Sequence, residues 1–268
     1  MGVISTVLGG NKKKTSSNNK GGVFFIATTF RDKITMSDLV AYKSNALIEA
    51  SYKLSLQEQR FLLVCISRIK SGVDAPSPEM QKTMTITSAE FYDAFPDMGR
   101  QHAETKLREA IDRLWDRSVI IRDENKREEF RWVQYRAQYL KGEAKVEITF
   151  SDAIMPYLTQ LKGQFTRVVV KNVSSLSSTY SIRIYELLQQ FRSTGDRTIA
   201  LNDFRSMLDL DDKYQQFKDL NKLLLKPAIA ELNEKSDLTV TVETVKKGRT
   251  VVALRFQFKE DKQIKLAV

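Results

Sequence analysis

The most regular spacing of apolar residues lies between residues 214 and 236 and predicts a helix with one buried face. Apolar side chains recur there at intervals of three and four residues, at Phe217, Leu220, Leu224, Ala228 and Leu232. The opposite side carries Gln215, Lys218, Asp219, Lys222 and Lys226. A basic, polar front is typical of a helix that reads DNA. It is equally typical of a helix whose outer face is only solvated.

A hairpin is predicted directly after this helix and favours the first interpretation. Residues 238–245 and residues 250–258 each alternate between apolar and polar types, as strands do. The turn between them is basic and consists of Lys246, Lys247, Gly248 and Arg249. A helix followed by a hairpin with a basic tip is the second half of a winged helix.

The first half of the chain shows a similar order of elements. Helices are predicted at residues 39–52, 55–70, 88–94 and 102–118, and strands at 84–86, 119–122, 130–139 and 145–150. Ser55 and Glu58 have capping-box spacing at the start of the second of these helices. The charged residues 123–129 form the tip of a first wing in this interpretation.

The same order returns later in the chain. Residues 176–192 correspond to 54–69, residues 197–210 to 82–95, and the helix at 214–236 to that at 102–118. A helix at 152–161 and a strand at 165–170 would open this second copy. The sequence therefore predicts an α+β fold of two tandem winged-helix domains related by a pseudo-repeat. We place these domains at residues 37–150 and 151–260, between a disordered N-terminal tail at 1–36 and a C-terminal tail at 261–268.

Charge is distributed unevenly over these parts. The 268 residues carry a net charge of +10. Residues 1–36 contain six Lys or Arg and one acidic residue, a net charge of +5. Residues 37–150 contain 18 basic and 18 acidic residues and are neutral. Residues 151–268 contain 19 basic and 14 acidic residues, again a net charge of +5. Excess positive charge favours a polyanionic partner. The polar stretch 11–22 has no periodicity and is expected to be disordered, although residues 23–30 could form a short strand. The whole part upstream of Met36 is expected to be dispensable.

Several kinds of chemistry are excluded by composition. The chain has one Cys and one His, Cys65 and His102, so a Cys/His zinc site cannot be built, and the single Cys fits a reducing cytoplasm. No P-loop motif occurs, and no apolar run is long enough to cross a membrane. We expect neither a cofactor nor a catalytic residue. A metal-dependent nuclease would have to use the acidic pairs Asp211–Asp212 or Glu128–Glu129, both in predicted turns.

Three stretches resemble one known family. Residues 45–63 (NALIEASYKLSLQEQRFLL), 176–188 (LSSTYSIRIYELL) and 224–233 (LLKPAIAELN) resemble the iteron-binding plasmid replication initiators. The likeness runs in the same order from Ser37 to Lys259 and leaves residues 1–36 unsupported. The resemblance implies two winged-helix domains that bind one face of a repeated origin sequence, the iteron. It also implies a non-enzymatic initiator that opens the origin.

The resemblance further implies a division of labour between the domains. The C-terminal domain would read the major groove of double-stranded DNA with its third helix. The N-terminal domain would contact the other end of the repeat and mediate dimerisation. Monomers would open the origin with host replication proteins and chaperones in the bacterial cytoplasm, while dimers would repress the initiator's own gene. A winged-helix transcriptional repressor without initiator activity is the alternative.

The DNA-binding candidates follow from this division. The reading segment supplies Gln215, Lys218, Asn221, Lys222 and Lys226, of which Asn221 falls towards the apolar side of the helix. Asn and Gln can pair with adenine and Lys with guanine. Phosphate contacts are expected from Arg205, Lys246, Lys247 and Arg249. In the first domain the candidates are Lys106, Arg108 and Arg113, whose neighbouring carboxylates equally favour a self-paired surface. Pro227 is expected to kink the helix just past the reading segment.

Overall fold

The computed structural model describes residues 39–71, 74–122, 124–142, 144–161, 163–210 and 212–261. The chain divides into the units Met1–Lys33 and Ile34–Val268, and all the described residues belong to the second. The predicted tail at 1–36, its strand at 23–30 and nearly all of 261–268 lie outside the described residues.

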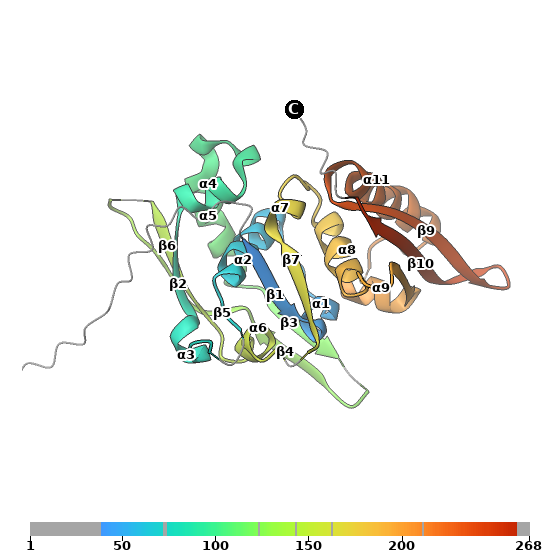
Figure 1. The fold of residues 1–268 in the computed structure, drawn as a ribbon, viewed down its shortest axis with the longest axis horizontal. Coiled ribbons are helices and arrows are strands. Elements are labelled where there is room, and N and C mark those ends of the chain that lie inside the picture. Colours follow the sequence, from blue (N-terminus) through green and yellow to red (C-terminus); the bar gives the residue numbers. More distant parts are fainter. Residues whose placement is uncertain are drawn as a thin grey trace, which may run out of the picture. The chain divides into compact units, whose positions relative to one another are not determined.

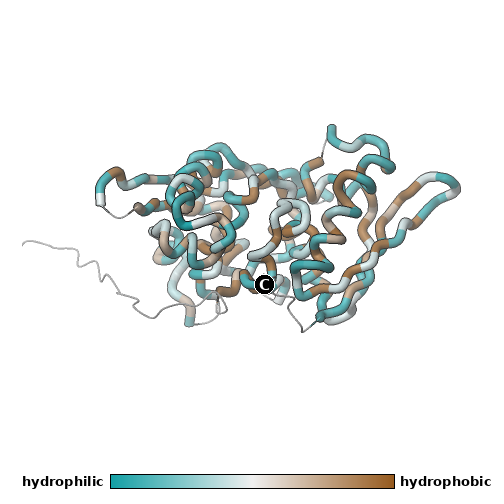
Figure 2. The backbone as a smooth tube through the Cα atoms, turned by 90° about the horizontal axis from the view of Figure 1, so that it is seen from above, coloured by the Kyte–Doolittle hydropathy of each residue, from teal (hydrophilic) through white to brown (hydrophobic). Residues whose placement is uncertain are grey.

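The C-terminal part of the chain forms a winged helix. Its elements are α8 (Thr179–Gln189), β8 (Asp196–Ala200), α9 (Leu201–Met207), a helical segment from Phe217 to Lys235, β9 (Leu238–Lys247) and β10 (Thr250–Glu260). The strands form an antiparallel sheet in the order β8-β10-β9. The hairpin β9–β10 extends beyond helices α9 and α11, and its tip is hydrophilic (Figures 1 and 2).

Alternation along β10 attaches this sheet to the helices. Leu254, Phe256 and Phe258 are buried, while the residues between them are exposed. Phe256 stacks on Phe204 of α9 with 5.9 Å between ring centroids. Since burying one such side chain contributes about 1.5–3 kcal/mol, this row fixes the position of the hairpin against α9.

The N-terminal part repeats the same arrangement. Its elements are α2 (Leu56–Ser67), β2 (Thr83–Thr87), α4 (Ser88–Ala94), α5 (Arg100–Leu114), β5 (Val133–Gln138) and β6 (Lys145–Phe150). The sheet order β2-β6-β5 matches β8-β10-β9 strand for strand. The capping box predicted at Ser55 and Glu58 is present at the start of α2. The matching sheet orders confirm the prediction of two related winged helices.

The first wing lies elsewhere than predicted. Residues 119–139 do not form one hairpin around the charged tip at 123–129: β3 (Ser118–Arg122) and β4 (Arg127–Arg131) make a separate two-stranded sheet. Trp132 is fully buried where the chain passes from β4 to β5. The hairpin that corresponds to β9–β10 is β5–β6. Glu128 and Glu129 lie in β4, not in a turn, and pair with Lys126 and Arg127.

Two further predictions of helix are corrected. Residues 39–52 contain β1 (Val40–Ser44) followed by the short helix α1 (Asn45–Glu49), and β1 pairs antiparallel with β7 (Phe165–Val169). Strand β1 forms because Ala41 and Lys43 point inwards while their neighbours are half-buried. Within residues 152–161 only α6 (Met155–Thr159) is helical. Two more short helices are α3 (Pro78–Gln81) and α7 (Val170–Val173).

The segment predicted at 214–236 is helical from Phe217 and is not uniform. It consists of α10 (Phe217–Leu220), a π-helical turn (Asn221–Leu225) and α11 (Lys226–Lys235). Leu220, Leu224, Ala228 and Leu232 are each four residues apart, so in a regular helix with 3.6 residues per turn this row would drift around the axis. The wider π turn absorbs part of the drift, and all four side chains are buried.

A buried charged cluster joins the β1–β7 sheet to α8. Lys43 Nζ lies 2.6 Å from Glu186 Oε1, and Arg183 Nη1 lies 2.8 Å from Glu186 Oε2. Arg183 Nη2 also donates to the carbonyls of Ile48 (2.8 Å) and Met207 (3.1 Å). Burial lowers the pKa of Lys43, against the opposing effect of Glu186. Burial opposes ionisation of Glu186, but the two cations hold its pKa below the ordinary value.

Candidate nucleic-acid interface

The helical segment Phe217–Lys235 is called the reading helix below, after its predicted role. A groove opens between the second hairpin, helix α9 and the start of the reading helix. Its volume is about 820 Å³. It is lined by Leu201, Asn202, Arg205, Gln215, Phe217, Asn221, Thr244, Lys246, Arg249, Thr250 and Val251. Five predicted DNA-binding residues therefore meet in one place, although they come from α9, the loop before α10, the π turn and the hairpin. The carboxylate-free lining gives the groove the charge that suits a phosphate backbone.

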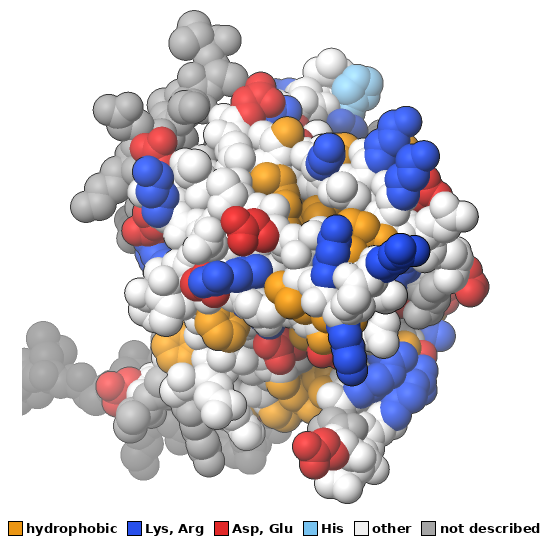
Figure 3. Space-filling view, turned by 90° about the vertical axis from the view of Figure 1, so that its right-hand side faces the viewer, with side chains coloured by type: hydrophobic (Ala, Val, Ile, Leu, Met, Phe, Trp, Pro, Cys, Tyr) orange, Lys and Arg blue, Asp and Glu red, His pale blue; other side chains and the backbone are white. Residues whose placement is uncertain are grey.

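The front of the reading helix is basic, as its spacing predicts. Lys218, Lys222 and Lys226 are exposed. Asn221, which falls towards the apolar side of a regular helix, is half-exposed and lines the groove. The π turn that begins at Asn221 changes the angular spacing of the residues that follow. Figure 3 shows the face on the right-hand side of Figure 1, where many Lys and Arg side chains lie around a strip of apolar ones.

The two lysines of the second wing face opposite sides of the hairpin. Thr244 pairs with the buried Leu254, and Lys246 pairs with Val251, so these side chains share the inner face. Lys247 is one residue further along and points to the outer face. Arg249 follows Gly248, whose φ of +62° suits the tight turn. Lys246 and Arg249 line the groove, and Lys247 is not among the lining residues.

Arg205 already has hydrogen-bond partners within the protein. Its Nη1 donates to the carbonyl of Lys213 (3.1 Å), and its Nη2 donates to the carbonyls of Tyr214 and Gln215. Tyr214 has a φ of +52°, in the left-handed region that a tyrosine seldom adopts. The guanidinium therefore fastens the loop that leads into the reading helix.

The first-domain candidates on α5 are largely engaged within the domain. Lys106 Nζ donates to the carbonyl of Met98 (3.1 Å). Arg108 pairs with Glu104 (2.9 Å) and also donates to the side chain of Gln138 and the carbonyl of Tyr139. Arg113 is exposed on the outer face. The ion pair with Glu104 engages Arg108 within the domain, and whether Arg108 also contacts DNA stays a prediction.

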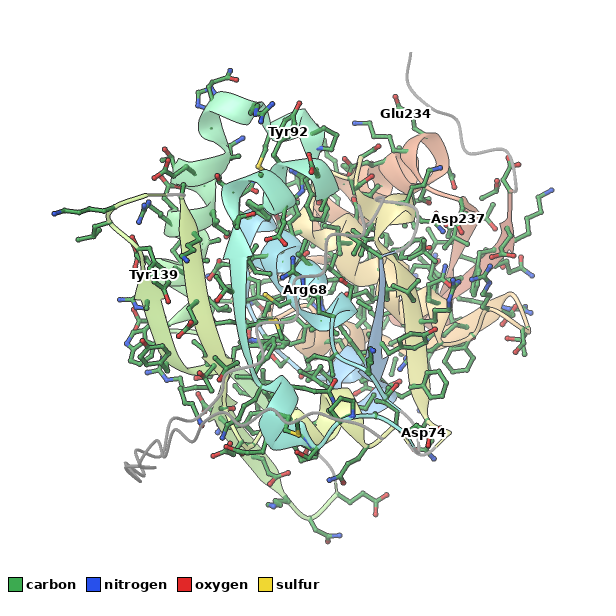
Figure 4. The ribbon with its side chains drawn as sticks, turned by 60° about the vertical axis from the view of Figure 1, so that its left-hand side comes forward. Arg68, Asp74, Tyr92, Tyr139, Glu234 and Asp237 are labelled. Atoms are coloured by element: carbon green, nitrogen blue, oxygen red, sulfur yellow. The ribbon has the colours of Figure 1, made fainter. Side chains whose placement is uncertain are left out.

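Side chains bridge the space between α5 and the first hairpin, which corresponds to the groove of the second domain. Arg136 Nη1 donates to Asp112 Oδ1 (2.7 Å), and Gln138 Nε2 donates to the same oxygen (2.9 Å). Figure 4 labels Tyr139 on this hairpin. Lys145 Nζ lies 4.4 Å from the centroid of the Tyr139 ring. The first domain therefore presents a neutral, internally paired surface where the second presents a basic groove.

Sequence reasoning missed part of the groove. Asn202, Thr244 and Thr250 supply polar groups to its lining, and Phe217 and Val251 supply apolar ones. The strand alternation could have placed Thr244 on the same face as Lys246. No local signal marks Asn202, because its role depends on α9 lying opposite the hairpin.

The described residues offer little for covalent chemistry. Cys65 is fully buried, and burial raises the pKa of its thiol. His102 is exposed near the start of α5. No cluster of three or more His, Cys, Asp or Glu that could hold a metal occurs in the part of the chain that the structure describes. No helix within that part is long and apolar enough to cross a membrane.

Comparison with known proteins shows that two parts of the chain match family models. Residues 40–189 match the family described as Initiator Replication protein, WH1, and residues 200–258 match Initiator Rep protein, WH2. The first match continues past the boundary predicted at residue 150, whose position stays a prediction. A replication initiation protein of Escherichia coli is 33% identical over 238 residues, which cover 86% of this chain and 73% of that protein.

Two further matches, one in sequence and one in structure, are to proteins named PI or Pi. The PI protein of Escherichia coli is 27% identical over 141 residues, 46% of each chain. The crystal structure of the Pi initiator protein in complex with iteron DNA has a TM-score of 0.71 at 20% identity, and it covers 85% of this chain and 99% of that one. This likeness shows a shared fold. By its two family matches and its Escherichia coli relative, the chain belongs to the replication initiator protein family.

Proposed function

We propose that this chain initiates replication by binding repeated origin sequences, the iterons, in double-stranded DNA. The observation that carries the proposal is the basic groove of the second winged helix, which brings Gln215, Asn221, Lys246 and Arg249 together. The exposed lysines of the reading helix lie on the same helical segment as Asn221. The Pi initiator, which shares the fold, was crystallised with iteron DNA.

Within this proposal the contacts differ in what they contribute. The front of the reading helix, with Lys218, Lys222 and Lys226, enters the major groove, where Lys can bond to guanine and Asn to adenine. Lys246 and Arg249 contact phosphates, which adds affinity for every sequence. The first domain adds contacts to the other end of the repeat, for which the exposed Arg113 is the most accessible of the α5 candidates.

The protein acts by binding, without a catalytic step, in the bacterial cytoplasm. Dimerisation through the N-terminal domain, with repression of the initiator's own gene, belongs to the same proposal. Host replication proteins and chaperones are its expected protein partners. Neutral charge over residues 37–150 supports a role for this part in protein contacts, because a neutral surface gains little from DNA phosphates.

The experiment has two stages. Bound sequences are first selected from a random duplex pool with the full-length protein, and we expect one recurrent motif. Strand-specific permanganate reactivity is then measured on a plasmid that carries repeats of this motif beside an AT-rich segment. Protein-dependent reactivity in that segment supports an initiator. Tight binding without any opening, with host replication proteins present, supports the repressor alternative instead.

A further inference from the structure

An exposed leucine stands on the basic front of the reading helix. Leu223 is 57% exposed, whereas the next two leucines, Leu224 and Leu225, are 2% and 1% exposed. Its neighbours in the exposed row are Lys222 and Lys226, followed by Pro227 and Ala230. A single exposed leucine is ordinary on a protein surface. Leu223 is unusual because it is an apolar residue on the helix face that is proposed to meet DNA.

Two irregular backbone features lie beside Leu223. Pro227 has no amide hydrogen, and its ring crowds the carbonyl four residues earlier, which is that of Leu223. The π turn Asn221–Leu225 lies directly before α11, whose second residue is Pro227, and widens the helix at this place. Leu224 and Leu225 remain in the core, and Leu223 is left on the outside. Single π turns of this kind are frequent at functional sites.

We propose that Leu223 determines specificity by contacting the C5-methyl group of a thymine in the major groove, an inference that rests on the proposed function. A leucine side chain has no hydrogen-bonding group, so it cannot distinguish the donors and acceptors of base edges. The thymine methyl is the apolar feature that the major groove offers. Lys222 and Lys226, next to it on the same exposed front, are attracted to the duplex and hold the helix against it.

The test uses the duplex selected from the random pool by the full-length protein. Each thymine is replaced in turn by deoxyuridine, which removes only the methyl group, and binding is measured by fluorescence anisotropy. For the wild type, one or two replacements should raise the Kd about three- to five-fold, the effect of about one buried methyl group. Leu223→Ala should raise the Kd of the unmodified duplex to a similar extent and should lose the sensitivity to those replacements.

Two more variants control the comparison. Leu140→Ala removes a leucine that is 87% exposed on the first hairpin, and it should behave as the wild type on every duplex. Leu223→Met keeps an apolar side chain and should retain sensitivity to the same deoxyuridine positions. Circular dichroism melting checks that each variant is folded.

Three outcomes would overturn the inference. The first is a wild type that is insensitive to every deoxyuridine. The second is a Leu223→Ala variant that keeps the wild-type pattern of sensitivity. The third is a Leu223→Ala variant that changes the oligomeric state in sedimentation while its deoxyuridine pattern is unchanged, which would assign Leu223 to a protein contact. If the pool yields no preferred sequence at all, the proposed function fails as well.

Discussion

The two lysines of the second wing offer a sharp comparison, because they are adjacent in sequence and lie on opposite faces of the hairpin. Lys246 lines the groove and Lys247 does not, although both are exposed. Lys246→Ala should therefore remove one phosphate contact, and Lys247→Ala should remove none. Both variants lose the same charge, so any difference between them comes from position.

The magnitude follows from counterion release. Each phosphate contact contributes about 0.9 to the slope of log K against log salt concentration. Lys246→Ala should lower that slope by about one unit on every duplex, so its affinity deficit should shrink roughly eight-fold when the salt concentration rises ten-fold. Lys247→Ala should give a curve nearly parallel to that of the wild type.

Fluorescence titrations at four or more salt concentrations, with the selected duplex and a scrambled one, measure these slopes. Arg249→Ala serves as a second groove variant and should behave as Lys246→Ala does. Equal slopes for Lys246→Ala and Lys247→Ala would refute the reasoning, because they would mean that the inner face of the hairpin is not the face that meets DNA.

Two other predictions concern the scaffold of the site. Glu186→Gln should reduce the free energy of unfolding by about 3–5 kcal/mol in urea titrations, since it leaves Lys43 and Arg183 buried without their shared carboxylate. Glu129→Gln, in an exposed pair with Arg127, should cost less than about 1 kcal/mol. Equal losses for the two variants would contradict the assigned role of the cluster. Because the pKa of Glu186 is lowered in the folded protein, its carboxylate should contribute fully to the free energy of unfolding above about pH 4.5, and this contribution should be lost as the pH falls through the folded pKa. Glu186→Gln should therefore flatten the acid side of a plot of the free energy of unfolding against pH. Arg205→Ala should weaken binding and leave the salt slope unchanged, because its guanidinium holds the loop before the reading helix; a slope lower by one unit would return Arg205 to the phosphate contacts.

Local pattern was sufficient for the elements whose buried face repeats within one segment. The stripe from Leu220 to Leu232 and the alternation of β9 and β10 appear in the structure where the sequence predicts them. The exposure of Lys218, Lys222 and Lys226 follows from the same periodicity. These elements are predictable because side chains three to four residues apart on a helix, or two apart on a strand, share a face regardless of the rest of the chain.

Elements that depend on distant partners were predicted less well. Strand β1 was expected to be helical because its pairing partner β7 lies about 125 residues later in the chain. The first wing was misplaced because residues 123–129 and the segment around Gly142 are both turn candidates. In the structure Trp132 is buried between the two hairpins, which belong to separate sheets. The position of Asn221 could not be found from a regular helical wheel, since the π turn alters the spacing.

In the proposed function, recognition of the origin repeats depends most on the front of the reading helix, which distinguishes base sequences. The most direct test of this role is the Kd of Lys222→Ala for the selected duplex and for a scrambled duplex at one salt concentration. A base contact is worth about 1–3 kcal/mol of discrimination, so the ratio of the Kd for the scrambled duplex to the Kd for the selected duplex should fall by about 5- to 160-fold, chiefly through weaker binding to the selected duplex. Equal losses of affinity on the two duplexes would contradict the claim and would show that Lys222 adds only charge to a solvated helix.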